Sequence, residues 1–171
     1  MRRPIIGVMG PGHAEKALEE TAFALGEGIA GAGWILLTGG RRAGVMDAAS
    51  RGAKTVAGSI TVGVLPTGPE SGDVSDAVDI AIFTNMGDAR NAINVLSCDA
   101  VIACGAATPG TLSEVALALK SGRHVVLVGA SDDTASFLEG CHGWVHRAAD
   151  AAEAIALIRS LGIPAGEPWP R

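Results

Sequence analysis

Residues 4–13 read Pro-Ile-Ile-Gly-Val-Met-Gly-Pro-Gly-His, a short uncharged apolar run that ends in a glycine loop. The arrangement recurs at 34–44, where Trp-Ile-Leu-Leu-Thr precedes Gly-Gly-Arg-Arg-Ala-Gly, and at 99–110, where Asp-Ala-Val-Ile-Ala-Cys precedes Gly-Ala-Ala-Thr-Pro-Gly. These runs are continuously apolar and do not alternate with polar residues, which is typical of strands buried on both faces. An amphipathic stretch of helical length follows each loop. The pattern therefore predicts a parallel sheet with helical crossovers.

The rest of the chain continues this alternation. Further strands are predicted at 59–65, 78–83 and 124–128, and a short edge strand at 143–146; helices are predicted at 14–32, 44–57, 88–97, 111–121 and 150–161. Residues 66–76 are rich in Gly, Pro, Ser and acids, and predict an exposed loop. Such alternation predicts an α/β fold, a Rossmann-like doubly wound parallel sheet with helices on both faces. We expect residues 1–171 to form a single nucleotide-binding domain.

Composition excludes several classes of protein. Hydrophobic residues make up 48% of the chain, but no uncharged apolar run reaches the ~18 residues of a membrane span. Met1-Arg2-Arg3-Pro4 starts like a signal peptide, but no cleavage site follows the apolar run, which we interpret as a first strand. The net charge of −5 and the absence of tyrosine argue against a nucleic-acid partner. Three cysteines, two in apolar segments, favour a cytoplasmic protein with reduced thiols.

The glycine loops predict an anion site. Open parallel sheets bind ligands beyond the carboxyl ends of their strands, and helix N-termini there favour phosphate. Each loop alone has an alternative interpretation as a simple tight turn. None is a Walker loop, and none has the Gly-x-Gly-x-x-Gly spacing of dinucleotide enzymes, which argues against a dehydrogenase. Three loops at one edge favour a shared site for a small phosphorylated ligand.

Two charged residues near these loops have alternative roles. Thr111-Leu112-Ser113-Glu114 has the form of a capping box, and we expect Glu114 to cap the helix, although it would also lie beside the phosphate site. Arg90 is either a solvated helix residue or a fixed cation for a phosphate. His13 follows a glycine turn, but nothing assigns it a ligand. Cys141, His142 and His146 do not have a standard zinc spacing, so no metal site is predicted.

At these loops the sequence resembles a known superfamily. Residues 38–46, 86–91 and 110–114 resemble the Gly-Gly-Gly-x-x-Gly-Leu-Met, Met-x-x-Arg-Lys and Gly-Thr-x-x-Glu motifs of the Lonely Guy (LOG) phosphoribohydrolases, formerly called lysine decarboxylases. The resemblance implies that Arg90 and Glu114 are the candidate catalytic residues. It also implies a set of ligand-binding residues: Gly10, Gly12, Gly39, Gly40, Arg41, Gly44, Met46, Arg90, Asn91, Thr108, Gly110 and Thr111.

Within that superfamily, residues 44–54, 62–66 and 111–120 are more similar to the molybdenum-cofactor-carrier-like branch. The resemblance implies a bound nucleotide or molybdenum cofactor, since the characterised carrier binds this phosphorylated pterin without reacting with it. The chain departs from the enzymes at 106–109, where two glycines are missing and Pro109 removes an N–H donor, although the Thr108 hydroxyl could supply one. Arg41 replaces the third glycine of the first motif, and Asn91 replaces a lysine.

These observations leave two hypotheses. The first, which we favour because of the altered 106–109 loop, is a protein that binds a nucleoside monophosphate or molybdopterin-like ligand without efficient turnover. The alternative is a nucleoside 5′-monophosphate phosphoribohydrolase, whose reaction passes through an oxocarbenium-like state. The resemblance implies that Glu114 would stabilise the sugar cation or position water, and that Arg90 would orient the phosphate or the reacting sugar. The helices predicted at 88–97 and 111–121 carry little charge, so we expect a partner chain to cover them in a homodimer or higher even oligomer.

Overall fold

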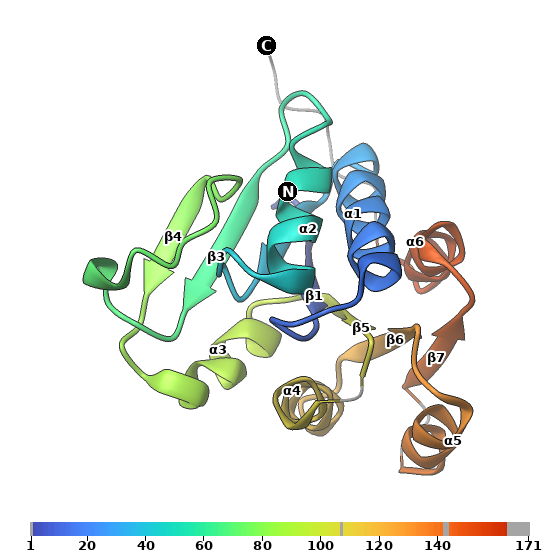
Figure 1. The fold of residues 1–171 in the computed structure, drawn as a ribbon. Coiled ribbons are helices and arrows are strands. Elements are labelled where there is room, and N and C mark those ends of the chain that lie inside the picture. Colours follow the sequence, from blue (N-terminus) through green and yellow to red (C-terminus); the bar gives the residue numbers. More distant parts are fainter. Residues whose placement is uncertain (1, 107, 142–143, 164–171) are drawn as a thin grey trace.

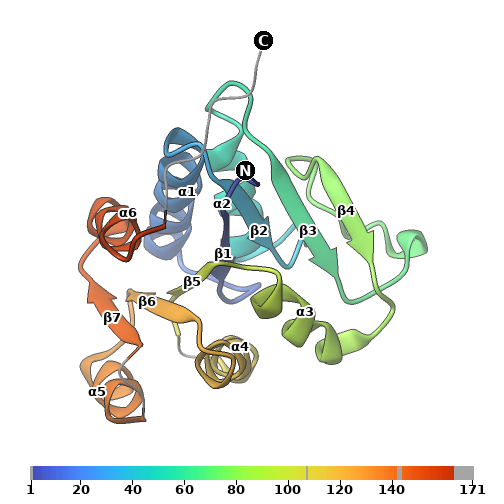
Figure 2. The same cartoon turned by 180° about the vertical axis from the view of Figure 1, so that it is seen from behind.

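The computed structural model describes residues 2–106, 108–141 and 144–163, and within them one seven-stranded, entirely parallel sheet (Figures 1 and 2). The strands are β1 (Ile5–Met9), β2 (Ile35–Thr38), β3 (Thr61–Leu65), β4 (Ile80–Phe83), β5 (Ala100–Cys104), β6 (His124–Val128) and β7 (Val145–Ala148). The α-helices are α1 (Lys16–Gly31), α2 (Gly44–Ala53), α3 (Asn91–Leu96), α4 (Pro109–Lys120), α5 (Asp132–Cys141) and α6 (Ala151–Ser160). Two 3₁₀ turns, η1 (Pro69–Ser71) and η2 (Gly87–Arg90), complete the regular structure of the described residues.

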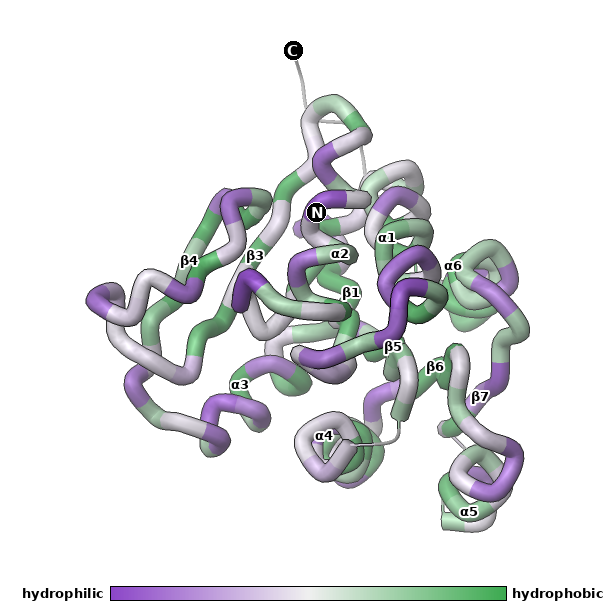
Figure 3. Tube along the Cα trace, viewed as in Figure 1, coloured by the Kyte–Doolittle hydropathy of each residue, from purple (hydrophilic) through white to green (hydrophobic). Residues whose placement is uncertain are grey.

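The helices form two layers on opposite faces of the sheet. Helices α1, α2 and α6 cover one face, and α3, α4 and α5 cover the other (Figure 1). Alternate residues of one strand enter different cores: Val126 packs with the α1 side, and Val125 and Leu127 pack with the α4 side. Both faces of the central strands are therefore apolar, and Figure 3 shows hydrophobic colour along β1 and β6. The predicted doubly wound α/β fold is confirmed.

The strand order places a ligand site. Along the sheet the order is β4-β3-β2-β1-β5-β6-β7, so the chain winds outward from β1 in one direction and then from β5 in the other. The crossovers after β1 and after β5 consequently lie on opposite faces, which leaves a crevice at the carboxyl ends of these two strands. Within the described part of the chain, no helix combines the length and the hydropathy that a membrane span requires.

Several segments differ from the sequence-based prediction. The edge strand predicted at 143–146 is β7 at Val145–Ala148, and position 143 lies outside the described residues; the helix predicted at 88–97 is divided into η2 and α3. Helix α5 was not predicted; its sequence signal is Ser131, whose hydroxyl accepts a hydrogen bond from the amide of Thr134 at 3.3 Å and caps the first turn. The 66–76 loop is exposed only in part. It contains η1 and pairs with the loop after β2 through an antiparallel bridge between Arg41 and Val74.

Candidate ligand-binding cleft

A single cleft gathers most of the predicted site residues. It lies at the carboxyl edge of the sheet, between the loops after β1 and β2, the η2–α3 turn and the first two turns of α4. Eleven of the thirteen predicted residues line it: Gly10, Gly12, Gly39, Arg41, Met46, Arg90, Asn91, Thr108, Gly110, Thr111 and Glu114. Pro11 and Asp88, which the sequence did not single out, line it as well. Only their positions in the sequence could have pointed to the site: Pro11 lies between two predicted glycines, and Asp88 stands two residues before Arg90.

Gly40 and Gly44 do not line the cleft but shape the backbone behind it. Gly44 has φ +46°, and a Cβ there would lie 2.5 Å from the backbone oxygen of Pro11. The start of α2 therefore packs directly on the loop after β1. Gly40 has φ +74° and packs in the same way against Gly63 of β3. Both positions need glycine for the geometry of the loops, because an L side chain rarely adopts a positive φ.

Arg90 is the central cation of the cleft. It ends η2, and its side chain is 10% exposed. Its guanidinium lies over Gly39, where a Cβ would come within 2.8 Å of Nη1 and Nη2. Among the described residues, Nε and Nη1 have no hydrogen-bond partner although both atoms are buried. The solvated alternative is therefore wrong: Arg90 is a buried cation with unused donors.

Glu114 is also in the cleft, and the predicted capping box is wrong. Helix α4 begins at Pro109, two residues earlier than predicted, and Thr108 is the N-cap, with Oγ1 3.4 Å from the amide of Thr111. Pro109 favours this earlier start, because its fixed φ suits the first position of a helix. The N–H that proline lacks would have no partner within the helix at that position. Glu114 is then on the second turn and buried, too far along the helix to cap it.

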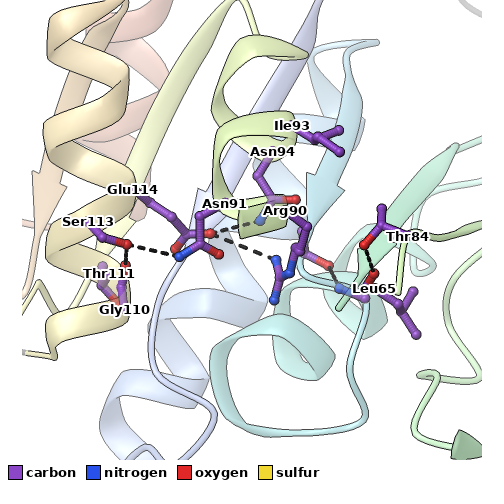
Figure 4. A network of polar contacts seen from close by, with 12 residues as sticks. Leu65, Thr84, Arg90, Asn91, Ile93, Asn94, Gly110, Thr111, Ser113 and Glu114 are labelled. Carbon is purple, nitrogen blue, oxygen red and sulfur yellow. Dashed lines mark hydrogen bonds and ion pairs between the residues drawn. The ribbon is translucent and has the colours of Figure 1, made fainter. Parts of the chain in front are cut away.

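A polar network holds the Glu114 carboxylate across the cleft (Figure 4). Asn94 Nδ2 donates to Glu114 Oε1 at 2.8 Å, and Arg90 Nη1 lies 3.9 Å from the same oxygen. Beside it, Asn91 Nδ2 donates to Ser113 Oγ at 2.9 Å, so α3 and α4 are joined at two points. Asn94 was missed from sequence. Its only signal was that it stands four residues after Arg90, on the same face of the turn.

Burial and the neighbouring charges act in opposite directions on the pKa values of Glu114 and Arg90. Burial raises the pKa of Glu114, and the hydrogen bond from Asn94 and the charge of Arg90 partly offset that effect. Burial likewise lowers the pKa of Arg90, while Glu114 and Asp88 raise it and Arg41 lowers it. The guanidinium remains protonated, because arginine is not deprotonated in proteins. The base of the cleft thus holds one cation and one carboxyl group, both largely removed from water.

Arg41 brings a second cation to the mouth of the cleft. Its Nε donates to Asp73 Oδ2 at 2.5 Å, and the side chain is 45% exposed. Asp73 belongs to the 66–76 loop, and the neighbouring Arg42 pairs with Asp76 of the same loop. Arg41 is therefore balanced by a carboxylate when the cleft holds no anion, whereas Arg90 still has free donors.

The described residues contain no group of three or more potential metal ligands of the His, Cys, Asp and Glu types. Of the cysteine–histidine group noted in the sequence, His142 lies outside the described residues. His13 does not line the cleft. Chemically, the cleft offers a buried guanidinium, an amide side chain, two threonine hydroxyls and the amides of a helix N-terminus, which is a donor set suited to a phosphate.

Comparison with known proteins identifies the family. A model of the SLOG cluster4 family matches residues 3–155. The molybdenum cofactor binding protein of the phototrophic bacterium Rippkaea orientalis superposes with a TM-score of 0.88 at 51% identity, over 94% of this chain and 98% of that one. The molybdenum cofactor carrier protein of Chlamydomonas reinhardtii superposes with a TM-score of 0.85 at 50% identity, over the same shares of the two chains. An uncharacterized protein of Archaeoglobus fulgidus is 43% identical over 120 residues, which is 70% of this chain and 76% of that protein. The predicted similarity to the carrier-like branch is confirmed.

Proposed function

The chain belongs to the SLOG cluster4 family, and from this premise we propose that it binds the molybdenum cofactor or a related phosphorylated nucleotide-type ligand as a carrier, without efficient turnover. Two relatives at 50% identity or more are named as molybdenum cofactor binding or carrier proteins. The family model matches residues 3–155, and this span includes every residue that lines the cleft.

The observation that carries the proposal is the buried guanidinium of Arg90. Leaving charged donors buried without hydrogen bonds destabilises the protein, and an anion in the cleft would remove that cost. A phosphate oxygen is a strong acceptor for an arginine fork. Gly39 makes room for this arrangement, because only a residue without a Cβ lets the guanidinium lie against the loop after β2.

The size of the cleft indicates which part of the ligand it encloses. The volume of the cleft is about 160 Å³. Pockets that enclose a drug-sized molecule measure roughly 300–1,000 Å³. We therefore place the phosphate end of the ligand at the base, against Arg90, Asn91 and the start of α4. The larger ring system would then lie toward Arg41, whose side chain is 45% exposed. The molybdenum centre supplies its own redox chemistry, and the protein's part is to hold the phosphate and the pterin.

The second candidate function is hydrolysis of a nucleoside 5′-monophosphate at its N-glycosidic bond. Glu114 favours it, because this carboxyl group is in the cleft, 3.9 Å from Arg90, and has no role in capping α4. Two features argue against efficient turnover. Glu114 Oε1 is engaged by Asn94, and the segment that leads into α4 carries Ala106, Thr108 and Pro109 where the enzymes that it resembles have a glycine-rich loop.

Two measurements test the proposal. The first is native mass spectrometry, with metal analysis, of protein purified without oxygen. We expect molybdenum and a pterin to co-purify with the protein. The second is the release of adenine from adenosine monophosphate by wild type and by Glu114→Gln; we expect little or none from either. Rapid release by wild type that disappears in Glu114→Gln would make this protein a phosphoribohydrolase and overturn the carrier proposal.

We also propose a homodimer or higher even oligomer. The apolar side chains that support this are exposed on β4, on α3 and α4, and at the residue before η2. Leu96 of α3 is 54% exposed and Ile80 of β4 is 50% exposed; Ile82, Phe83, Met86 and Leu112 are also exposed. An edge strand that exposes apolar side chains favours self-association. Light scattering at micromolar concentration should give at least a dimer, and Ile82→Lys should weaken it; a clean wild-type monomer would refute it.

The remaining proposals concern the context of the protein. One continuous sheet supports the treatment of the chain as one domain. Cys98 and Cys104 are buried free thiols, and burial raises the pKa of each, which makes them unreactive. Reduced, unpaired core cysteines support a cytoplasmic location.

A further inference from the structure

The sheet brings two histidines together that are 22 residues apart in the sequence. His124 begins β6, and His146 is the second residue of β7. Val126 pairs with His146, so the two rings are diagonal neighbours on one face of the sheet. His124 Nδ1 and His146 Nε2 are 3.0 Å apart, and the ring planes are tilted by 36°. In the sequence, His146 stands near Cys141 and His142, whereas in the fold it lies beside His124.

The separation of these nitrogens fits a shared metal ion. Imidazole nitrogens bind late transition metals at ~2.0–2.1 Å, so two of them in adjacent coordination positions lie roughly 2.9–3.4 Å from each other. The pair already has this spacing. To bind a metal, the shared proton must leave, and the rings must turn until both lone pairs point at a common position. Burial and the neighbouring His146 lower the pKa of His124, which favours the neutral, metal-competent ring.

The two cations next to the histidines in sequence have partners of their own. Arg147, the next residue along β7, is on the opposite face, where it pairs with Glu139 and Asp132. Arg123 donates to the backbone oxygen of Leu96. Both cations are therefore engaged elsewhere. Because no group of three potential ligands occurs among the described residues, the histidines would supply two ligands and water the rest.

We propose that His124 and His146 form a two-histidine site for a divalent late transition metal ion, separate from the ligand cleft. The site lies at the amino-terminal ends of β6 and β7, whereas the cleft lies beyond the carboxyl ends of β1 and β2. Cu²⁺ is the ion that such a nitrogen pair binds most tightly, with Zn²⁺ and Ni²⁺ weaker.

Trp144 provides the means to test the site. Its ring lies 4.4 Å from that of His124, so bound Cu²⁺ should quench its fluorescence. Of the other two tryptophans, Trp34 is fully buried and Trp169 lies outside the described residues, so Trp144→Phe identifies the signal of Trp144. The experiment titrates full-length protein with Cu²⁺ at neutral pH, and repeats the titration with Zn²⁺ by calorimetry, because Zn²⁺ does not oxidise thiols. We expect one ion per chain, and affinity reduced about tenfold or more in both His124→Gln and His146→Gln.

The controls separate this site from other ligands. His13→Gln should bind as wild type, and Trp144→Phe should bind Zn²⁺ but lose most of the quenching. Paramagnetic resonance of Cu²⁺-loaded wild type should show two imidazole nitrogens, which tests the proposal even if a histidine variant folds poorly. Unchanged affinity in both histidine variants would overturn it. A loss confined to Cys141→Ser or His142→Gln would also overturn it, because the metal would then bind at the other group.

Discussion

Replacing Gly39 with alanine should separate ligand binding from folding. The new Cβ would lie 2.6 Å from Met46 Sδ and 2.8 Å from both terminal nitrogens of Arg90. An ordinary contact needs at least 3.4 Å, so both side chains must retreat. Each contact is with the end of a flexible side chain and not with backbone, so the fold can adjust.

The two effects of this change differ in size. Gly39 is not among the glycines with positive φ, so alanine adds no backbone strain there, and it stabilises through the unfolded chain by ~0.4–1 kcal/mol. We expect this to offset most of the repacking cost and to leave Tm within roughly 4 °C of wild type. Displacing Arg90 removes a hydrogen bond to a charged ligand, worth about 1.5–3 kcal/mol, or about 10- to 150-fold in Kd.

Calorimetry with adenosine monophosphate as the phosphate probe, alongside thermal unfolding, measures both quantities. Gly31→Ala is the matched control, because a Cβ at Gly31, at the end of α1 and away from the cleft, meets nothing within 4 Å. It should change neither Kd nor the fold. If Gly39→Ala folds normally and binds as tightly as wild type, Arg90 does not contact the phosphate and the proposed placement of the ligand is wrong.

Three further predictions follow from the same geometry. Gly44→Ala places a Cβ against the backbone of Pro11 at φ +46°, and a backbone atom cannot move away as a flexible side chain can. The substitution should lower the free energy of unfolding by about 2 kcal/mol or more, which lowers Tm by roughly 4–8 °C. Thr108→Ala removes the N-cap of α4 and should cost about 1 kcal/mol by urea unfolding, whereas Ser121→Ala, at the other end of the helix, should be nearly neutral. Because the folded-state pKa of Glu114 is raised, its contribution to stability is fully present below the unfolded pKa and is lost as pH rises through the folded pKa. The Tm of wild type relative to Glu114→Gln should therefore fall as pH rises from about 4 through the raised pKa, and a pH-independent difference would contradict that shift.

The sequence was sufficient to predict the sheet and the edge at which the cleft forms. Continuous apolar runs such as 124–128 predict strands because burial on both faces leaves no polar position. Glycine at 10 and 39 predicted the loops for a similar local reason, since a Cβ at either position would lie 2.6 Å from its nearest neighbour. Helix α5 was missed because its apolar stripe is short and its start depends on a single serine.

The tertiary structure alone decided what the charged residues do. Local sequence predicted that Glu114 caps α4, and could not show that Pro109 starts that helix earlier and moves Glu114 to its second turn. Nor could it show that Arg90 is buried over Gly39, or that His124 faces His146 across two strands. Hydrophobic periodicity is a property of neighbouring residues and is visible in the sequence. The role of a charge depends on its burial and on the partners that the strand order brings to it, and these are set only when the whole chain has folded.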